Sequence, residues 1–292
     1  MRRASTIIVV VCLAARVMRA ISTGTCHVRG VTSVDDELFV LLERNIMQVS
    51  WKDIDCMEDN DNVIVYSIND DYQLLRRLNV AGEQSSDMTS CVRHKCLYMS
   101  DAGSSCIHRY ELASSATSQW PVPGKPCGLS VTPSGNLLVT CREPNKLVEL
   151  SADSGHYVRE IALQSDIVGP QHSVQLTTGQ FVVCHGHRYS AVHRVCVVGD
   201  DGKVTRSYGD QRGSDVGQLD NPRHLAVDKD ESIFVADIGN DRVVLLSPTL
   251  EFVRYVIDEQ LSKPRRLHFH QATRRLFVGQ DEWPGEVTVI HL

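Results

Sequence analysis

The sequence has little of what several functional classes need. Aromatic residues make up only 6% of the 292 positions, which leaves few rings for stacking on nucleic-acid bases. Positive charge is not in excess either, since 30 Lys and Arg stand against 36 Asp and Glu, for a net charge of -6. A global basic field for nucleic acid is therefore excluded. No Gly-x-Ser-x-Gly, P-loop or His-Glu-x-x-His motif occurs, so nothing indicates nucleophilic or hydride chemistry.

Long apolar runs and linker-like segments are also scarce. The run from Ile7 to Ala15 is too short to span a membrane, although Arg2 and Arg3 before it give the start the form of a secretory signal. No Pro-, Gly- or Ser-rich stretch and no block of charge marks a linker. The sequence thus predicts one domain over residues 15–292, after a signal-like or disordered segment at residues 1–14.

The spacing of the ten cysteines does not match a metal-binding motif. No Cys-x-x-Cys pair occurs, and the spacing fits neither a zinc finger nor a RING. Most lie among apolar residues, which predicts buried free thiols; a disulfide from Cys91 to Cys96 or Cys106 is the alternative. Scattered thiols favour the cytoplasm, whereas a signal at residues 1–15 would direct the protein to secretion.

A repeat is present instead. Apolar, strand-like segments recur at steps of 40 to 59 residues, and their equivalent positions are Val40, Met99, Val139, Val183, Val235 and Val278. Most follow another apolar strand that begins after a turn, and a more polar strand with a recurring Arg ends the unit. Units of four antiparallel strands at this period stack radially into a β-propeller. The sequence therefore predicts an all-β, six-bladed β-propeller.

The expected blades cover residues 28–82, 87–122, 125–163, 169–210, 221–257 and 263–292. The sixth unit ends after its third strand, at residues 287–292. Residues 15–22, "ARVMRAIS", match the pattern of the outer strands. We expect this N-terminal strand to complete the last blade, because a closed ring leaves no blade short of a strand.

One unit carries a family motif. Residues 217–248 resemble the NHL repeat, and its turn and polar positions include Pro222, Asp228, Asp237, Asn240 and Arg242. The other positions that match the family pattern are Gly217, Leu219, Leu225, Ala226, Val227, Ile233, Phe234, Val235, Ala236 and Val243. Glu231 departs from the family, which usually has Gly there. The chain is similar to the NHL propellers of invertebrate tripartite-motif-like proteins, but no RING, B-box or coiled coil is present to imply ubiquitin-ligase activity. Asp and Asn side chains satisfy turn amides and Arg can fork onto acceptors, so we expect a structural role for the motif.

Candidate binding residues come from the turns that open on one face of a propeller. They are Trp51, His172, His185, His187, Arg188, Arg223, His224, Arg266 and Trp283. His172 and His224 occupy equivalent positions in neighbouring units, with Gly128 and Arg266 in two others. Related six-bladed amidating lyases hold a metal there with histidines, but catalytic zinc needs three protein ligands, and an Arg in that set argues against a cation.

These features predict a non-enzymatic recognition scaffold, monomeric and without a cofactor, that binds a protein or peptide partner through the loops of one face. An RNA-binding propeller is one alternative, which the net charge of -6 disfavours. A metal-dependent hydrolase or lyase that uses His172 and His224 is the other. The stretch "CHGH", residues 184–187, is a further candidate for zinc because it offers soft and imidazole ligands.

Overall fold

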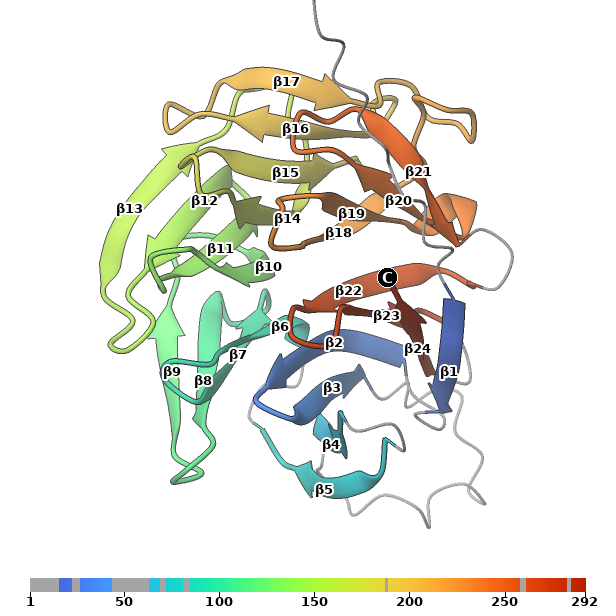
Figure 1. The fold of residues 1–292 in the computed structure, drawn as a ribbon. Coiled ribbons are helices and arrows are strands. Elements are labelled where there is room, and N and C mark those ends of the chain that lie inside the picture. The colour runs from blue at the N-terminus through green and yellow to red at the C-terminus, as the bar shows by residue number, and fades with distance from the viewer. Residues whose placement is uncertain are drawn as a thin grey trace, which may run out of the picture.

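The computed structural model describes residues 16–22, 27–43, 63–68, 72–80, 85–186, 189–257, 261–282 and 285–292. Six four-stranded antiparallel sheets surround a common centre, with the first strand of each blade nearest the middle and the fourth on the rim (Figure 1). The six-bladed all-β propeller predicted from the repeat is confirmed. Within the described segments there is no helix with the length and apolar character to cross a bilayer.

The first three blades follow one another along the chain. Blade 1 holds β2 (His27–Val34), β3 (Glu37–Glu43), β4 (Val63–Ser67) and β5 (Leu74–Leu78). Blade 2 holds β6 (Ser85–Cys91), β7 (Cys96–Asp101), β8 (Cys106–Glu111) and β9 (Thr117–Pro121). Blade 3 holds β10 (Pro126–Val131), β11 (Leu137–Arg142), β12 (Asn145–Leu150) and β13 (Tyr157–Ala162).

The last three blades complete the ring. Blade 4 holds β14 (Pro170–Gln175), β15 (Phe181–His185), β16 (Arg194–Val198) and β17 (Val204–Tyr208). Blade 5 holds β18 (Pro222–Val227), β19 (Ile233–Asp237), the short 3-10 helix η2 (Ile238–Asn240), β20 (Arg242–Leu246) and β21 (Phe252–Ile257). Blade 6 holds β22 (Pro264–His270), β23 (Arg275–Gln280), β24 (Glu286–His291) and β1 (Arg16–Ser22).

The N-terminal strand closes the ring. β1 pairs antiparallel with β24, in a register that runs from Arg16 opposite His291 to Ser22 opposite Glu286. The strand order of this sheet is β1-β24-β23-β22, so β1 is the outermost strand of the last blade. The prediction that an N-terminal strand supplies the missing strand is confirmed for residues 16–22, and this strand joins the two ends of the described chain in one sheet.

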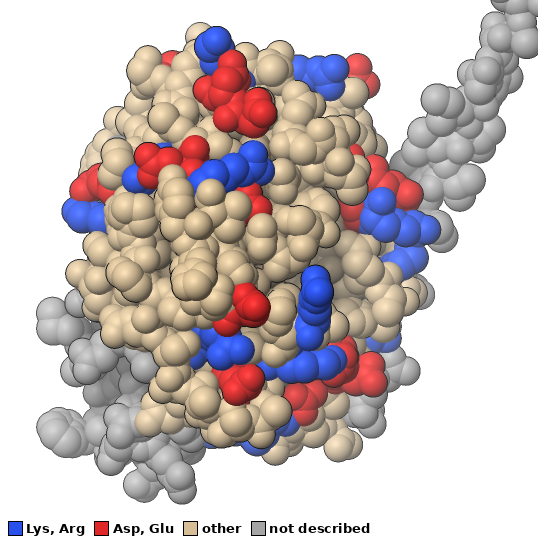
Figure 2. All heavy atoms as spheres, turned by 90° about the vertical axis from the view of Figure 1, so that its left-hand side faces the viewer, with Lys and Arg blue, Asp and Glu red and all other residues tan. Residues whose placement is uncertain are grey.

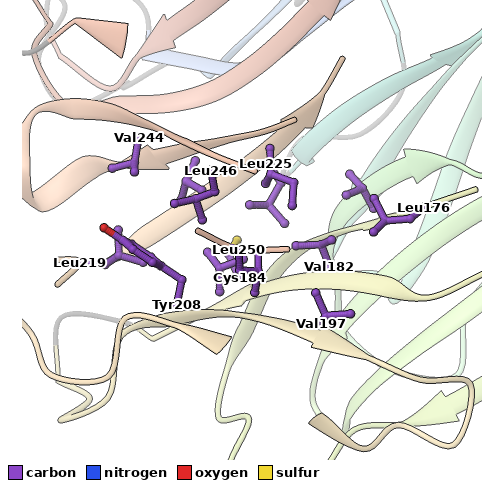
Figure 3. Packing of buried hydrophobic residues seen from close by; sticks show 14 residues of the cluster. Leu176, Val182, Cys184, Val197, Tyr208, Leu219, Leu225, Val244, Leu246 and Leu250 are labelled. Atoms are coloured by element: carbon purple, nitrogen blue, oxygen red, sulfur yellow. The ribbon is translucent and has the colours of Figure 1, made fainter. Parts of the chain in front are cut away.

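Apolar side chains on both faces of each blade explain why the blades stack. In β15, Val182 and Cys184 face blade 5, whereas Phe181 and Val183 face blade 3. The interface of blades 4 and 5 gathers Val197, Tyr208, Leu225, Val244 and Leu246 around them (Figure 3). Each such side chain contributes roughly 1.5–3 kcal/mol when it is fully buried. A blade can bury both faces only between two neighbours, so the repeat is stable as a ring.

The described cysteines are buried thiols. Seven of them, Cys91, Cys96, Cys106, Cys127, Cys141, Cys184 and Cys196, are buried and free, as the apolar context predicted. Cys91 and Cys96 stand opposite each other on β6 and β7, yet they are not bonded, so the alternative of a disulfide from Cys91 is wrong. Cys12, Cys26 and Cys56 lie outside the described residues.

Candidate functional site

Every blade has a β-bulge at the same place in its first strand. The pairing register skips one residue there, and the six bulged residues are Arg29, Ser86, Cys127, Gln171, Arg223 and Arg265. The next residues along the chain are Gly30, Asp87, Gly128, His172, His224 and Arg266. We call the first set the bulge ring and the second set the plug ring. Four of the strands begin with Pro directly before the bulge, where a missing N–H is tolerated.

The plug ring is centred on Asp87, a residue that sequence reasoning missed. Its side chain is 1% exposed and accepts a hydrogen bond from the Leu129 backbone N–H, at 2.9 Å. Arg266 Nε lies 3.0 Å from its carboxylate, and His224 Nε2 lies 3.4 Å from it. Burial alone would raise the pKa of Asp87, but the neighbouring Arg266, His224 and His172 lower it well below its usual range. The carboxylate is therefore charged and paired.

The two histidines of the plug ring are fully engaged. His172 Nδ1 accepts from Leu225 N–H at 3.4 Å, and its Nε2 donates to the Leu129 carbonyl at 2.9 Å. His224 Nδ1 likewise accepts from Leu267 N–H at 3.4 Å, which leaves its Nε2–H for Asp87. The rings stack with centroids 3.7 Å apart. In this arrangement neither imidazole has a lone pair left for a metal ion.

Arg266 fills the space that a cation would need. Its guanidinium donates to the carbonyls of Arg29, Arg265 and Ser86, and thus reaches from blade 6 across to blades 1 and 2. The plug ring therefore does not fit the metal site that the hydrolase or lyase alternative requires. Sequence reasoning placed His172, His224 and Arg266 near the channel mouth, but their residues are only 1%, 6% and 5% exposed.

Two glycines complete the plug ring because there is no room for a side chain. A Cβ on Gly128 would lie 2.5 Å from the Gln171 carbonyl oxygen and 2.8 Å from the His172 Cα. A Cβ on Gly30 would lie 2.5 Å from the Met88 Cβ. Four larger side chains and two glycines thus fill the centre together, which makes the plug ring a packed and paired structural element.

The bulge ring is different, because its Arg223 and the adjoining Arg142 share one neutral acceptor. Arg223 Nη1 and Arg142 Nη2, from the end of β11, both donate to Gln171 Oε1, at 2.6 and 2.8 Å. The Gln171 Nε2 donates to the Gly169 carbonyl, which turns the amide oxygen toward the two guanidinium groups. Two cations thus meet on one neutral oxygen. Within the described ranges, neither arginine has a carboxylate at ion-pair distance.

Two more arginines, Arg29 and Arg265 of the bulge ring, adjoin Arg142 and Arg223. Arg265 Nη1 donates to Asp281, and Arg29 Nη1 lies 3.6 Å from the same carboxylate. Burial, and then the repulsion of neighbouring arginines, lowers the pKa of Arg223 from its usual value. The Arg223 Nε is buried and has no hydrogen-bond partner within the described structure. We call Arg29, Arg142, Arg223 and Arg265, with Gln171 and Asp281, the mouth cluster.

The other predicted site residues are dispersed. Trp51, His187, Arg188 and Trp283 lie outside the described residues. His185 is 1% exposed, and its Nε2 accepts from Arg194 Nε at 2.8 Å; burial, and then Arg194, lowers its pKa to about 4. Cys184 and His185 are successive strand residues on opposite faces of β15, so they cannot bind one metal ion together.

Sequence reasoning found Arg223 but missed Arg29, Arg142, Arg265, Gln171 and Asp281. A signal was available in part: "PQH", "PRH" and "PRR" put the bulged residue directly after the recurring Pro. Arg29 and Asp87 have no such Pro before them. Arg142 and Asp281 come from the ends of second strands, or just beyond, and only the folded register brings them to the first strands.

The polar residues of the NHL-like unit hold a connector in place. Asp237 Oδ2 accepts from Asn240 Nδ2 at 2.7 Å and from Arg242 Nε at 2.8 Å. Arg242 also donates to the carbonyls of Ser214 and Gln218, in the connection between blades 4 and 5. These contacts tie the turn after β19 to the connector, so the residues serve the fold. Pro222 starts β18, and Asp228 caps the following turn with bonds to Asp230 N–H and Ser232 N–H.

The fold and centre define the chain as a six-bladed β-propeller. It is similar in structure to virginiamycin B lyase from Staphylococcus aureus, with a TM-score of 0.62 and 11% identity over 91% of this chain and 82% of that one. Hydrazine synthase of Kuenenia stuttgartiensis matches with a TM-score of 0.62 and 14% identity, over 93% and 97% of the two chains.

A protein of unknown function from Bacteroides caccae matches with a TM-score of 0.57 and 14% identity, over 75% of this chain and 80% of that one. At these identities the likeness extends to the fold alone. No protein-family model matches the chain, and no curated protein matches it by sequence.

Proposed function

We propose that this propeller is a binding module, not an enzyme, that takes up an acidic segment of a protein or peptide partner at the mouth cluster. The observation that carries this proposal is the meeting of Arg142 and Arg223 on the neutral Gln171 oxygen. Guanidinium groups held side by side without an anion are costly to bring together, and a carboxylate that accepts from both would relieve their repulsion.

The geometry of the cluster suits a carboxylate. Arg presents a planar fork that matches a carboxylate with two parallel hydrogen bonds. The arginines are anchored on strands of a rigid disc, so little side-chain entropy is lost when a ligand binds. The resemblance of residues 217–248 to the NHL repeat of tripartite-motif-like proteins also supports a recognition role.

Charge elsewhere on the molecule favours a peptide over RNA. The side of the disc that carries β9 and β13 shows basic and acidic side chains interspersed on a mainly uncharged surface (Figure 2). The whole chain has a net charge of -6. A nucleic-acid backbone needs a basic track along several phosphates, whereas an acidic side chain or a chain terminus needs one cluster.

The test is a titration of the full chain against a fluorescein-labelled peptide rich in Asp and Glu. We expect saturable binding that weakens with salt, and a loss of roughly tenfold or more in affinity for Arg223→Gln, because a bond to a charged group is removed. Arg206→Gln is the matched control, since Arg206 is exposed on the rim strand β17. We expect the affinity of this control to match that of the unchanged protein.

Two results would contradict the proposal. Equal weakening by Arg223→Gln and Arg206→Gln would mean that binding reflects overall charge and not the mouth cluster. Tighter binding of a labelled single-stranded RNA than of the acidic peptide, with the same loss in Arg223→Gln, would assign the site to RNA instead.

A further inference from the structure

The turn between the second and third strands differs between blades at one position. In blade 5, Arg242 begins the third strand opposite Asp237 and neutralises it. Lys146 and Arg194 stand at the same position in blades 3 and 4, opposite Cys141 and His185. In blade 2 the pair is Asp101 and Cys106, so a thiol occupies the position that holds a cation in three other blades.

Asp101 is nevertheless a buried carboxylate. It is 5% exposed, and its Oδ1 accepts from the N–H groups of Gly103 and Ser104, at 2.9 and 3.1 Å. Among the described residues no Lys or Arg lies within ion-pair distance of it, and its nearest basic group is His108. Buried carboxylates are as a rule paired with a cation or bound to a metal ion.

Three potential metal ligands converge at this carboxylate. Asp101 Oδ2 lies 3.3 Å from His108 Nε2, and Cys106 Sγ lies 3.5 Å from the same nitrogen. All three ligand atoms lie within 4.8 Å of one another. Zinc bonds of about 2.0–2.1 Å to nitrogen and oxygen and about 2.3 Å to sulfur, in a tetrahedron, place ligand atoms roughly 3.3–3.7 Å apart. The separations of 3.3 and 3.5 Å lie within this range.

The strands hold the three side chains in place. Cys106 and His108 are two residues apart on β8, so they project from the same face of the strand. Asp101 ends β7 directly opposite Cys106. Gln119 is exposed on the neighbouring rim strand and donates to Cys106 Sγ at 2.9 Å, so the site borders solvent on that side. Water on that side would supply the fourth ligand of a tetrahedral zinc ion.

We propose that Asp101, Cys106 and His108 bind one zinc ion, which takes the role in blade 2 that Arg242 has in blade 5. The Cys106 thiol gives its proton to water as the sulfur–zinc bond forms, and His108 binds through its neutral Nε2. A thiolate and an imidazole select zinc over the hard cations magnesium and calcium. The site is separate from the mouth cluster and does not depend on the binding function proposed there.

Cobalt(II) and zinc titrations of the full chain test the site. The chain is first stripped with a chelator, and its folding is checked by circular dichroism. We expect cobalt(II) to bind at one equivalent with a sulfur-to-cobalt charge-transfer absorption, and zinc to displace it. Thermal unfolding of the zinc form should occur at a higher temperature than that of the stripped form, because zinc binds the folded chain.

Variants locate the ligands. Cys106→Ser should abolish the charge-transfer absorption and weaken zinc binding roughly 100-fold or more. Asp101→Asn keeps the thiol and the turn geometry, so it should retain the charge-transfer absorption but bind cobalt(II) and zinc more weakly. This variant tests the site if Cys106→Ser does not fold. Cys196→Ser is the matched control, because Cys196 Sγ also contacts a buried imidazole, that of His185, but Arg194 holds the cation position there.

Three results would overturn the proposed zinc site. A stripped, folded chain that gives no charge-transfer absorption with cobalt(II) has no thiolate site. An absorption that survives in Cys106→Ser, or disappears in Cys196→Ser, would place the metal elsewhere.

Discussion

The bulge ring and the plug ring are one residue apart in every blade, yet they differ in how their charges are paired. In the plug ring, Asp87 is matched by Arg266 and by two neutral histidines, and glycines fill the remaining positions. In the bulge ring, Arg223 shares the neutral Gln171 amide oxygen with Arg142, which comes from the end of β11. The difference shows which ring serves the fold. Paired, packed groups stabilise the ring of blades, whereas Arg142 and Arg223 have no carboxylate at ion-pair distance among the described residues and are available to a ligand.

The largest expected effect comes from the plug ring. Asp87→Asn leaves the buried Arg266 without its carboxylate, and breaking such a pair from one side costs about 3–5 kcal/mol. Urea denaturation measures the free energy of unfolding. The double variant Asp87→Asn with Arg266→Met should recover part of the loss, because no unpaired charge remains. A loss below about 1 kcal/mol in the single variant would mean that the pair does not hold the centre.

The glycine of blade 3 gives the next effect. In Gly128→Ala the new Cβ meets backbone atoms of Gln171 and His172 at 2.5 and 2.8 Å, so two blades must separate slightly. We expect a loss of about 1–3 kcal/mol, the usual cost of overpacking. The control is Thr178→Ala, in the exposed turn between β14 and β15, which should be nearly neutral in the same denaturation assay. Gly179→Ala in that turn would be a poor control, because the φ of Gly179 is +87° and disfavours a side chain.

Acid should weaken the plug ring. Burial, and then His224, lowers the pKa of His172 to about 3. Below its unfolded pKa of about 6.5, the unfolded chain binds a proton that the folded chain excludes, so stability falls as pH decreases. One such histidine contributes a loss of about 1.4 kcal/mol per pH unit. Denaturation between pH 6 and 4 should show this contribution together with those of the other buried histidines, His185, His224 and His268. His172→Gln should lower the slope by about 1.4 kcal/mol per pH unit. An unchanged slope would contradict the assignment.

The smallest effect on stability is expected in the bulge ring. Arg223→Gln removes one hydrogen bond to Gln171 and also relieves repulsion among the arginines. The free energy of unfolding should therefore stay within about 1 kcal/mol of the unchanged protein, measured by urea denaturation. A loss as large as that of Asp87→Asn would erase the distinction between the two rings.

The fold could be predicted from the sequence because the same pattern of strands recurs in six units. Apolar, strand-like segments at steps of 40 to 59 residues, a recurring Pro and a spare strand at residues 15–22 sufficed for six blades and their closure. The equivalence of Gly128, His172, His224 and Arg266 was also readable, and the pairing registers place all four directly after the bulge.

The centre and the mouth were less predictable. The first strand of blade 2, "SSDMTSC", is polar and lacks the Pro, so Asp87 had no repeat signal to reveal it. Arg142 and Asp281 act in the mouth cluster through contacts to other blades or strands, which a single repeat does not record. Asp101 and Cys106 are neighbours only because β7 and β8 pair there. The positions of the mouth cluster and of the Asp101 site therefore depend on contacts between strands, which the pattern within a single strand does not show.

Charge reversal at the mouth tests the central claim most directly. The double variant Arg142→Glu with Arg223→Glu is titrated with two labelled peptides of equal length, one rich in Asp and Glu and one rich in Lys. We predict that the unchanged protein binds the acidic peptide, and that the variant loses this binding by roughly 100-fold or more and gains affinity for the Lys-rich peptide. A folded variant that still binds the acidic peptide as tightly as the unchanged protein would contradict the account.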